Sequence, residues 1–330
     1  MSGATPAVSA QPAAGQAPGA QSTAAAPARP TRPLVTLIRR EFWEHPALWL
    51  APLAVAALLL LGALVGTVYL DTGLAPTLGQ RQALFGIVAI GFNFPEFLTL
   101  GIITSIYAAD CLYTERKDRS ILFWKSMPVS DTLTVLAKVL VVMVIVPLGV
   151  YVLTCVTSLL ASGLYALRSF GGQVPASIWD TGIWLRVQAV SLVVVVASGL
   201  WYTPLTAYVL MVSAWARRSV WMWLLLPPVV LTVLEQLVFG THRVWDVVRY
   251  RLGLPLHQLR VSGGWTAAAG ASPDPRPGAD PSAVMNHAFA AVTSLDPRPL
   301  LSNPDLWLGL VAAVLFIAAA IRIRQYRDDT

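Results

Sequence analysis

Charge and cysteine are both scarce in this chain. Of its 330 residues, 12% are charged and 56% are hydrophobic. A soluble enzyme needs a charged surface, so this composition argues against one and is typical of a protein that crosses a membrane several times. The net charge of +6 is no sign of a nucleic-acid partner, because the basic residues gather at the ends of apolar runs, where membrane topology accounts for them.

The sequence also lacks the motifs of catalysis and of nucleotide binding. Cys111 and Cys155 are the only cysteines, and they show no spacing typical of metal ligands or of a disulfide framework. None of the four histidines belongs to a His-Glu-x-x-His pair, and neither a Gly-x-Ser-x-Gly elbow nor a phosphate-binding Gly-x-x-x-x-Gly-Lys-Ser/Thr loop occurs. We therefore expect no enzyme activity, and no cofactor or metal on this chain.

Two segments precede the first long apolar run. Residues 1–33 are rich in Ala, Pro, Gly, Ser and Gln, a composition that predicts a disordered tail and that lacks the apolar core of a secretory signal peptide. In the next segment, 34–46, Leu34, Ile38 and Phe42 recur every four positions while charged residues take the other faces. This spacing predicts a short helix that lies in the membrane interface.

Six apolar runs within residues 34–330 are long enough, or nearly so, to span the hydrocarbon core, which takes about 20 helical residues. Gly62 and Gly66 form a Gly-x-x-x-Gly pair in the first run and predict a face for close helix packing. Pro147 predicts a kink in the third run, and Ser130 is well placed to cap its first turn. We expect an all-α, polytopic membrane protein with spans at 48–70, 83–109, 130–167, 182–214, 220–239 and 306–321.

The distribution of Lys and Arg predicts the orientation of these spans. Six spans place both termini on one side, where the short flanks hold twelve basic residues against three on the other side. Because cytoplasmic loops carry the excess of Lys and Arg, we expect both termini in the cytoplasm of a multi-pass inner-membrane protein. The long loop 240–304 should then lie outside, with Trp245, Val248 and Leu252 on one face of a helix that rests on the outer surface.

The densest group of charges lies between the second and third spans. Residues 111–129 combine acidic and basic side chains with aromatic residues near both ends. This segment cannot enter hydrocarbon, because one Arg or Lys at the membrane centre costs on the order of 3 kcal/mol. It must lie at a membrane surface, where it can meet a soluble partner. Charges that only set topology, beside an aromatic belt, are the alternative interpretation.

Three polar residues fall inside predicted spans. Asn93 and Glu96 flank Pro95 in the second span, and Glu235 lies near the outer end of the fifth. An intramembrane carboxylate normally faces a cavity or a partner, so these residues are candidates for lining a translocation pathway. Two other interpretations stay open: Glu96 is protonated and hydrogen-bonded in a helix break, and Glu235 simply reaches the outer interface.

Four stretches of the chain carry a family resemblance. They are Arg40-Glu41-Phe42-Trp43-Glu44, Leu112–Asp131, Arg217-Arg218, and Asn303–Leu310 together with the ending Gln325-Tyr326-Arg327. With these stretches, the order of interfacial helix, six spans, charged segment and large outer loop resembles the permease subunits of the ABC-2 family of ATP-driven transporters. The resemblance covers nearly everything after residue 33.

This resemblance implies that two copies of the permease pair and that each docks a separate cytoplasmic ABC ATPase, which would hold the ATP and Mg. Closure of the ATPases would reach the membrane through segment 111–129. There Glu115 and Arg119 can pair at i, i+4, so that a helix forms at the surface. The residues expected to couple the ATPase are Glu115, Arg116, Lys117, Asp118 and Arg119, with Ile121, Trp124 and Met127 as apolar anchors.

The function expected on this basis is export of a hydrophobic or amphipathic substrate by a homodimer in contact with membrane lipid. The large outer loop supports a second interpretation, in which ATPase motion regulates an outer partner and no cargo moves. A third interpretation is a membrane-embedded enzyme that uses outer-loop groups such as His242, Asp246 and His257.

Overall fold

The protein was analysed as a computed structural model. It describes residue 3 and residues 33–65, 78–118, 130–169, 181–253, 260–261 and 295–326. The helical unit begins at Pro33. The expected tail, residues 1–33, lies almost wholly outside the described residues and stays a prediction.

Helices make up nearly all of the described chain. The N-terminal half contains α1 (Pro33–Glu44), α2 (Ala47–Val65), α3 (Leu78–Asp110), α4 (Tyr113–Lys117), α6 (Asp131–Leu140), the π-helical turn η2 (Val141–Ile145) and α7 (Val146–Ser169). The C-terminal half contains α8 (Thr181–Trp215), α9 (Val220–Phe239), α10 (Arg243–Leu252), α12 (Arg298–Leu301) and α13 (Pro304–Tyr326). Two short strands, β1 (Arg260–Val261) and β2 (Leu295–Asp296), pair antiparallel, with Arg260 opposite Asp296.

Six helical stretches are long and apolar enough to cross a membrane, which confirms the predicted number of spans. They are Ala47–Val65, Ala89–Lys117, Asp131–Leu164, Thr181–Trp215, Val220–Phe239 and Pro304–Tyr326. Each overlaps one of the expected runs. The chain is therefore a multi-pass membrane protein of the all-α class.

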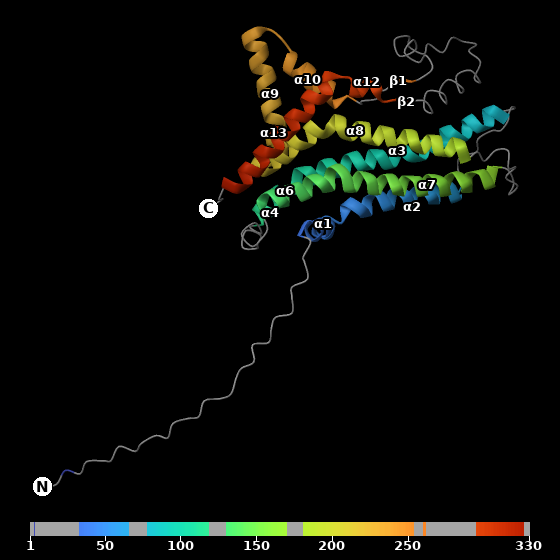
Figure 1. Ribbon diagram of the computed structural model, residues 1–330, viewed down its shortest axis with the longest axis horizontal. Coiled ribbons are helices and arrows are strands. Elements are labelled where there is room, and N and C mark those ends of the chain that lie inside the picture. The colour runs from blue at the N-terminus through green and yellow to red at the C-terminus, as the bar shows by residue number, and fades with distance from the viewer. Residues whose placement is uncertain are drawn as a thin grey trace. The chain divides into compact units, whose positions relative to one another are not determined.

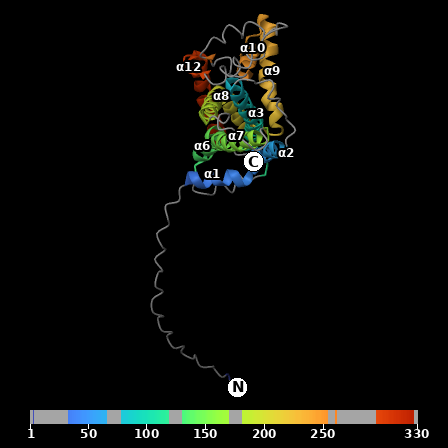
Figure 2. The same ribbon diagram turned by 90° about the vertical axis from the view of Figure 1, so that its right-hand side faces the viewer.

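A bundle of long helices forms the centre of the described structure. Figure 1 shows α2, α3, α7 and α8 running side by side, with α13 packed against α8. The main core cluster is formed by residues of α3, α6, η2, α7 and α8, with one residue each from α2 and α13. Figure 2 looks along this bundle and shows α1 crossing one of its faces.

The third span keeps its helical course despite a proline. Ser130 accepts a hydrogen bond from the Leu133 N–H at 3.2 Å, so the predicted N-cap is confirmed. Pro147 has no N–H to give to the preceding turn, and the π-helical turn η2 lies directly before it. In this turn the backbone N–H groups bond to carbonyls five residues earlier, so the regular α-helical pattern is interrupted near the predicted site of a kink.

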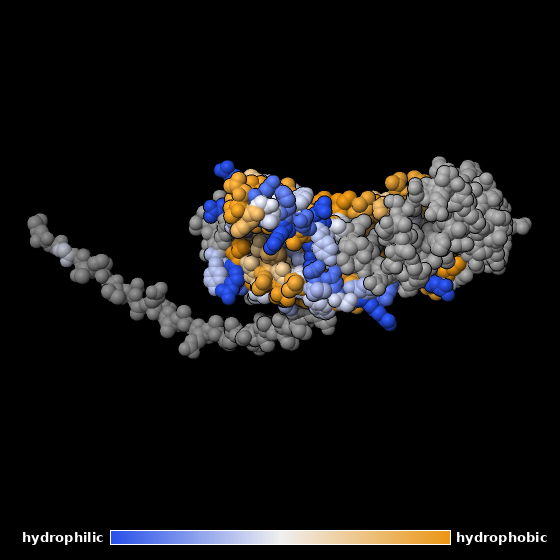
Figure 3. Space-filling view, turned by 90° about the horizontal axis from the view of Figure 1, so that it is seen from above, coloured by the Kyte–Doolittle hydropathy of each residue, from blue (hydrophilic) through white to orange (hydrophobic). Residues whose placement is uncertain are grey.

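Much of the surface is apolar, as a lipid-facing bundle requires. Figure 3 shows hydrophobic side chains over the face seen there. The extreme case is α9, because none of its apolar window is buried and side chains such as Leu237 and Phe239 are widely exposed. In water such a patch would drive association, whereas hydrocarbon solvates it.

The helix predicted in the loop 240–304 is present as α10, which packs back onto the bundle. Its Tyr250 ring meets Trp201 of α8 edge-on, with ring centroids 5.2 Å apart. The Arg251 guanidinium stacks over the Trp201 ring at 4.4 Å and donates a hydrogen bond to the Asp305 carbonyl of α13. Trp245 and Leu252 stay about half exposed or more, in keeping with a helix that rests on a surface.

Candidate functional site

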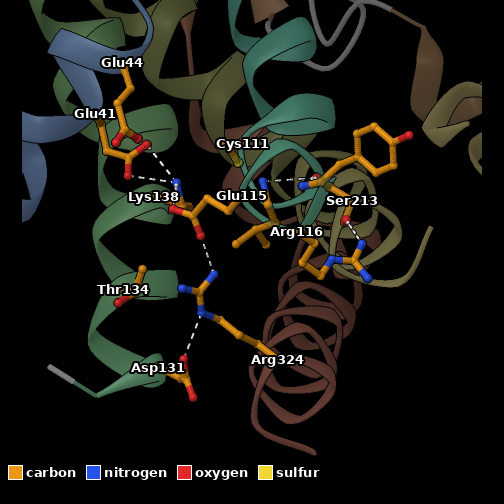
Figure 4. Close-up of polar contacts among 12 residues, drawn as sticks. Glu41, Glu44, Cys111, Glu115, Arg116, Asp131, Thr134, Lys138, Ser213 and Arg324 are labelled. Atoms are coloured by element: carbon orange, nitrogen blue, oxygen red, sulfur yellow. Dashed lines mark hydrogen bonds and ion pairs between the residues drawn. The ribbon is translucent and has the colours of Figure 1, made fainter. Parts of the chain in front are cut away.

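Charged side chains from several helices gather inside one end of the bundle. At this end α1, α4, the first turns of α6 and the last turns of α13 lie together (Figure 1). Acidic and basic groups alternate through the gathering, as Figure 4 shows. We call this set the ion-pair network, and it consists of Glu41, Lys138, Glu115, Arg324 and Asp131.

Lys138 of α6 is the central cation. Its side chain is completely buried, and its Nζ lies 2.8 and 2.9 Å from the two carboxylate oxygens of Glu41. It also lies 3.2 Å from Oε1 of Glu115. The Tyr107 hydroxyl of α3 donates a further hydrogen bond to Glu41, at 2.8 Å. The charged amine therefore joins α1 to α4 and α6, and Tyr107 adds α3.

Glu115 of α4 is the central anion, and three cations surround it. Arg324 of α13 donates to Oε2 at 2.5 Å, while Arg40 and Lys138 both approach Oε1. Arg324 uses its Nε to bind Asp131, at the start of α6, at 2.9 Å. Only about 5% of the Glu115 side chain is exposed, so its ionised form depends on these partners.

A buried network of this kind fixes geometry more than it adds stability. Removing an ion pair from water costs several kcal/mol per ion, and attraction inside the protein offsets this cost only when the geometry is good. A break that leaves one charge unpaired is strongly destabilising. The ends of α1, α4, α6 and α13 are thus held in one arrangement.

A second set of contacts binds α4 to the end of α8. Arg116 donates to the carbonyls of Ser213 and Ala216, at 2.7 and 2.8 Å, and so satisfies orphan carbonyls at the C-terminus of α8. The Ser213 hydroxyl in turn accepts from the backbone N–H groups of Leu112 and Tyr113. Tyr113 also donates its hydroxyl to the carbonyl of residue 218.

Three side chains in or beside the ion-pair network are of the types that bind metal ions. Glu41, Glu44 and His45 place one ligand atom each within 4.8 Å of the others. Lys138 already binds both oxygens of Glu41, and Arg40 binds Glu44 at 2.6 Å. These cations neutralise the carboxylates, so the arrangement is explained without a metal. Burial lowers the pKa of His45, although the nearby Glu41 opposes the effect.

The predicted coupling segment is found in part. Lys117 and Asp118 are exposed, as a docking surface requires, but Glu115 is buried and binds cations of its own chain. Its carboxylate faces three cations from other helices of the same chain, and the role expected for it in coupling an ATPase stays a prediction. Outside the described residues lie Arg119, Ile121, Trp124 and Met127, whose roles stay predictions.

The pathway candidates lie in two different settings. Asn93 and Glu96 are buried between α3, α7 and α8 within this one chain, with exposures of 2% and 0%. Polar groups of α7 and α8 cover them within the chain, and the role expected for them in a translocation pathway stays a prediction. Glu235 accepts hydrogen bonds from the Arg243 and Val244 N–H groups, and so caps α10.

The predicted packing face of the first span is open in this chain. A Cβ at Gly62 would meet no atom within 4 Å, and the residue is exposed. Gly66 lies outside the described residues. Within the chain, close packing at Gly62 does not occur.

Sequence reasoning missed most of the ion-pair network. Glu41 was assigned to the polar face of an interfacial helix, and Lys138, Asp131 and Arg324 received no joint role. Two signals were present. Lys138 stands alone among apolar residues of the third span, where a cation needs a partner, and Glu41 occupies the same face as the buried Leu37, one turn on.

The chain was compared with models of protein families, with curated proteins and with solved structures, and none of them matches it.

Proposed function

We propose that this chain is the membrane-spanning subunit of an ATP-driven transporter, which works as a homodimer with a separate cytoplasmic ABC ATPase. One observation carries the proposal. The short helix α4, at the end of the second crossing stretch, is bound by side chains to the ends of α1, α6, α8 and α13. In the proposed function α4 receives the motion of the ATPase.

The contacts of α4 suit the transmission of force. Glu115 connects the helix to three cations, and Arg116 connects it to the carbonyl end of α8. Displacing α4 alone would separate buried charges, which is costly, so the bonded helix ends should move with it. A push at the membrane surface would then reach spans two, three, four and six together.

The exposed part of the same segment is the proposed docking surface. Lys117 and Asp118 project from it, and the following residues up to 129 include the expected anchor Trp124. ATP and Mg belong to the partner chain, and hydrophobic or amphipathic cargo would move at the lipid-facing bundle. Orientation follows the excess of basic residues, with α4 and both termini in the cytoplasm.

The test is co-purification of this chain from its native membranes, in lipid nanodiscs, with identification of the ABC ATPase that accompanies it. We expect a stable complex that hydrolyses ATP, no hydrolysis by this chain alone, and weaker association after Trp124→Ala. Arg217→Ala serves as the control, since Arg217 is an exposed cation outside segment 111–129 and exposed charges contribute less than about 1 kcal/mol. Robust hydrolysis by the pure isolated chain would overturn the proposal.

A second candidate, regulation of an outer partner, has support from α13. This helix binds the ion-pair network through Arg324 near one end and contacts Arg251 of α10 near the other. Motion of α4 would therefore also reach the outer segment. Substrate transport by reconstituted vesicles distinguishes the two, because only the transporter moves cargo across an otherwise sealed membrane.

A further inference from the structure

Another buried carboxyl group, Glu96, lies far from the ion-pair network and has different neighbours. It is in α3, 14 residues before Asp110, and this separation corresponds to roughly 21 Å along a helix. Its side chain is completely buried, inside a stretch long and apolar enough to span the membrane. Whatever state this group adopts must be satisfied without bulk water.

The neighbours of Glu96 are hydroxyl, amide and thiol groups. Thr154 lies 2.7 Å from Oε2, and Thr157 lies beside the same carboxyl group. Next to it on α3, the Asn93 amide donates to Ser191 at 2.8 Å. The titratable groups that α7 places nearby are Tyr151 and Cys155. From α8 come the neutral polar side chains of Gln188 and Ser191. The adjoining helix α2 has no titratable residue.

Among the described residues no cation pairs with this carboxyl group, in contrast to Glu115, which has three. An ionised Glu96 would hold a full negative charge against neutral hydroxyl groups alone. Its other oxygen, Oε1, accepts no hydrogen bond from the described groups. A buried charge with so little compensation is strongly unfavourable.

The hydrogen-bond count favours the neutral acid. Thr154 has a single hydroxyl hydrogen, and its oxygen lies within hydrogen-bonding distance of both the Val150 carbonyl, at 2.8 Å, and Glu96. If Thr154 donates to Val150, its oxygen can accept a hydrogen bond from Glu96. A protonated Glu96 supplies the donor, and no charge remains buried.

We propose that Glu96 is an intramembrane proton-binding site, which holds its proton while α3 and α7 are packed together and releases it only when water enters between them. The bound ligand is a single proton, shared in a hydrogen bond with the Thr154 oxygen. Release forms a carboxylate at a place that has no cation among the described residues to pair with it, so water must reach the site. Proton loss and separation of α3 from α7 are therefore one linked event, whatever the chain transports.

Infrared spectroscopy of the full chain in nanodiscs tests the bound proton. We expect a protonated-carboxyl C=O band at neutral pH that Glu96→Gln removes and that Glu235→Gln, the matched control, leaves in place. Thr154→Val should shift the band by removing its hydrogen-bond acceptor, and this arm holds even if Glu96→Gln folds poorly. Absence of such a band, or its replacement by a carboxylate band in the presence of Na⁺ or K⁺, would overturn the proposal.

Hydrogen exchange tests the linkage. As the pH is raised until the acid band disappears, we expect exchange in α3 and α7, corrected for the intrinsic pH dependence, to increase several-fold in the wild type. Glu96→Gln cannot ionise, so its two helices should stay protected over the same range. Loss of the band without increased exchange, or an equal increase in Glu96→Gln, would contradict the linked opening.

Discussion

Replacing Lys138 by methionine should destabilise the protein far more than replacing any exposed cation at the same end of the bundle. Methionine is close to lysine in length and can fill the same space, so the change removes the charge with little change in volume. Glu41 would then remain buried, with the Tyr107 hydroxyl donating to it and its two hydrogen bonds to Lys138 gone. Glu115 would keep Arg324 and Arg40.

The magnitude follows from the distances. At an effective dielectric constant of about 20, two unit charges separated by the 2.8 Å between Lys138 and Glu41 attract by about 6 kcal/mol. The methionine variant avoids the cost of burying the amine, which offsets part of this loss. Breaking a buried pair typically costs about 3–5 kcal/mol. For a domain of this size, about 2 °C per kcal/mol gives a drop in melting temperature of about 6–10 °C.

The assay is thermal unfolding in detergent at one fixed scan rate, with Arg217→Met as the exposed-cation control. Arg217→Met should shift the melting temperature by about 1 °C at most. The double variant Glu41→Gln with Lys138→Met should recover at least half of the loss, because the unpaired carboxylate is gone. A Lys138→Met protein as stable as the wild type, or a double variant no better than Lys138→Met, would refute the view that the pair is buried and charged.

Three further predictions follow from other parts of the chain. In a background without native cysteines, Ser120→Cys and Arg217→Cys should resist an impermeant thiol reagent in intact cells while Ala267→Cys reacts; labelling at 120 from outside would reverse the orientation. Glu235→Ala should raise hydrogen exchange in the first turn of α10, whereas Glu235→Gln, which keeps one acceptor oxygen, should raise it less. Equal protection of this turn in the wild type and both variants would exclude the capping role. Because burial lowers the pKa of His45 below its unfolded value of 6.5, the folded state resists protonation, and stability should fall as the pH drops from about 6.5 toward the folded pKa. His45→Phe, which keeps a ring against Tyr107, should weaken this pH dependence of the melting temperature. The same pH dependence in His45→Phe and the wild type would count against this role of His45.

Local patterns in the sequence predicted the helices well. Apolar runs of span length gave six crossing helices, Ser130 gave the cap of α6, and the Trp245 spacing gave α10. Each of these features depends on residues close together in the chain, where periodicity and capping chemistry act directly. Pro147 predicted a kink in the third span, and the structure has the π-helical turn η2 shortly before this residue.

The partners of charged residues could not be predicted in the same way. Glu41 and Lys138 are 97 residues apart, and Glu115 and Arg324 are 209 apart, so no local pattern relates them. Helical periodicity indicates which residues share a face, but what covers that face depends on packing between distant helices. Glu115 was placed in a segment at the membrane surface, and its partners on α1, α6 and α13 could not be predicted from that segment alone.

The buried residues Glu115 and Glu96 lie in regions of the bundle that differ in mechanical character. At the end held by Glu115, separation of the helices would leave buried charges without their partners, so this end should move as a unit. Around Glu96 the contacts are neutral hydrogen bonds, each contributing about 1 kcal/mol, and opening there requires only water and the loss of one proton. A force at the Glu115 end should therefore separate α3 from α7 near Glu96 before the ion-pair network opens.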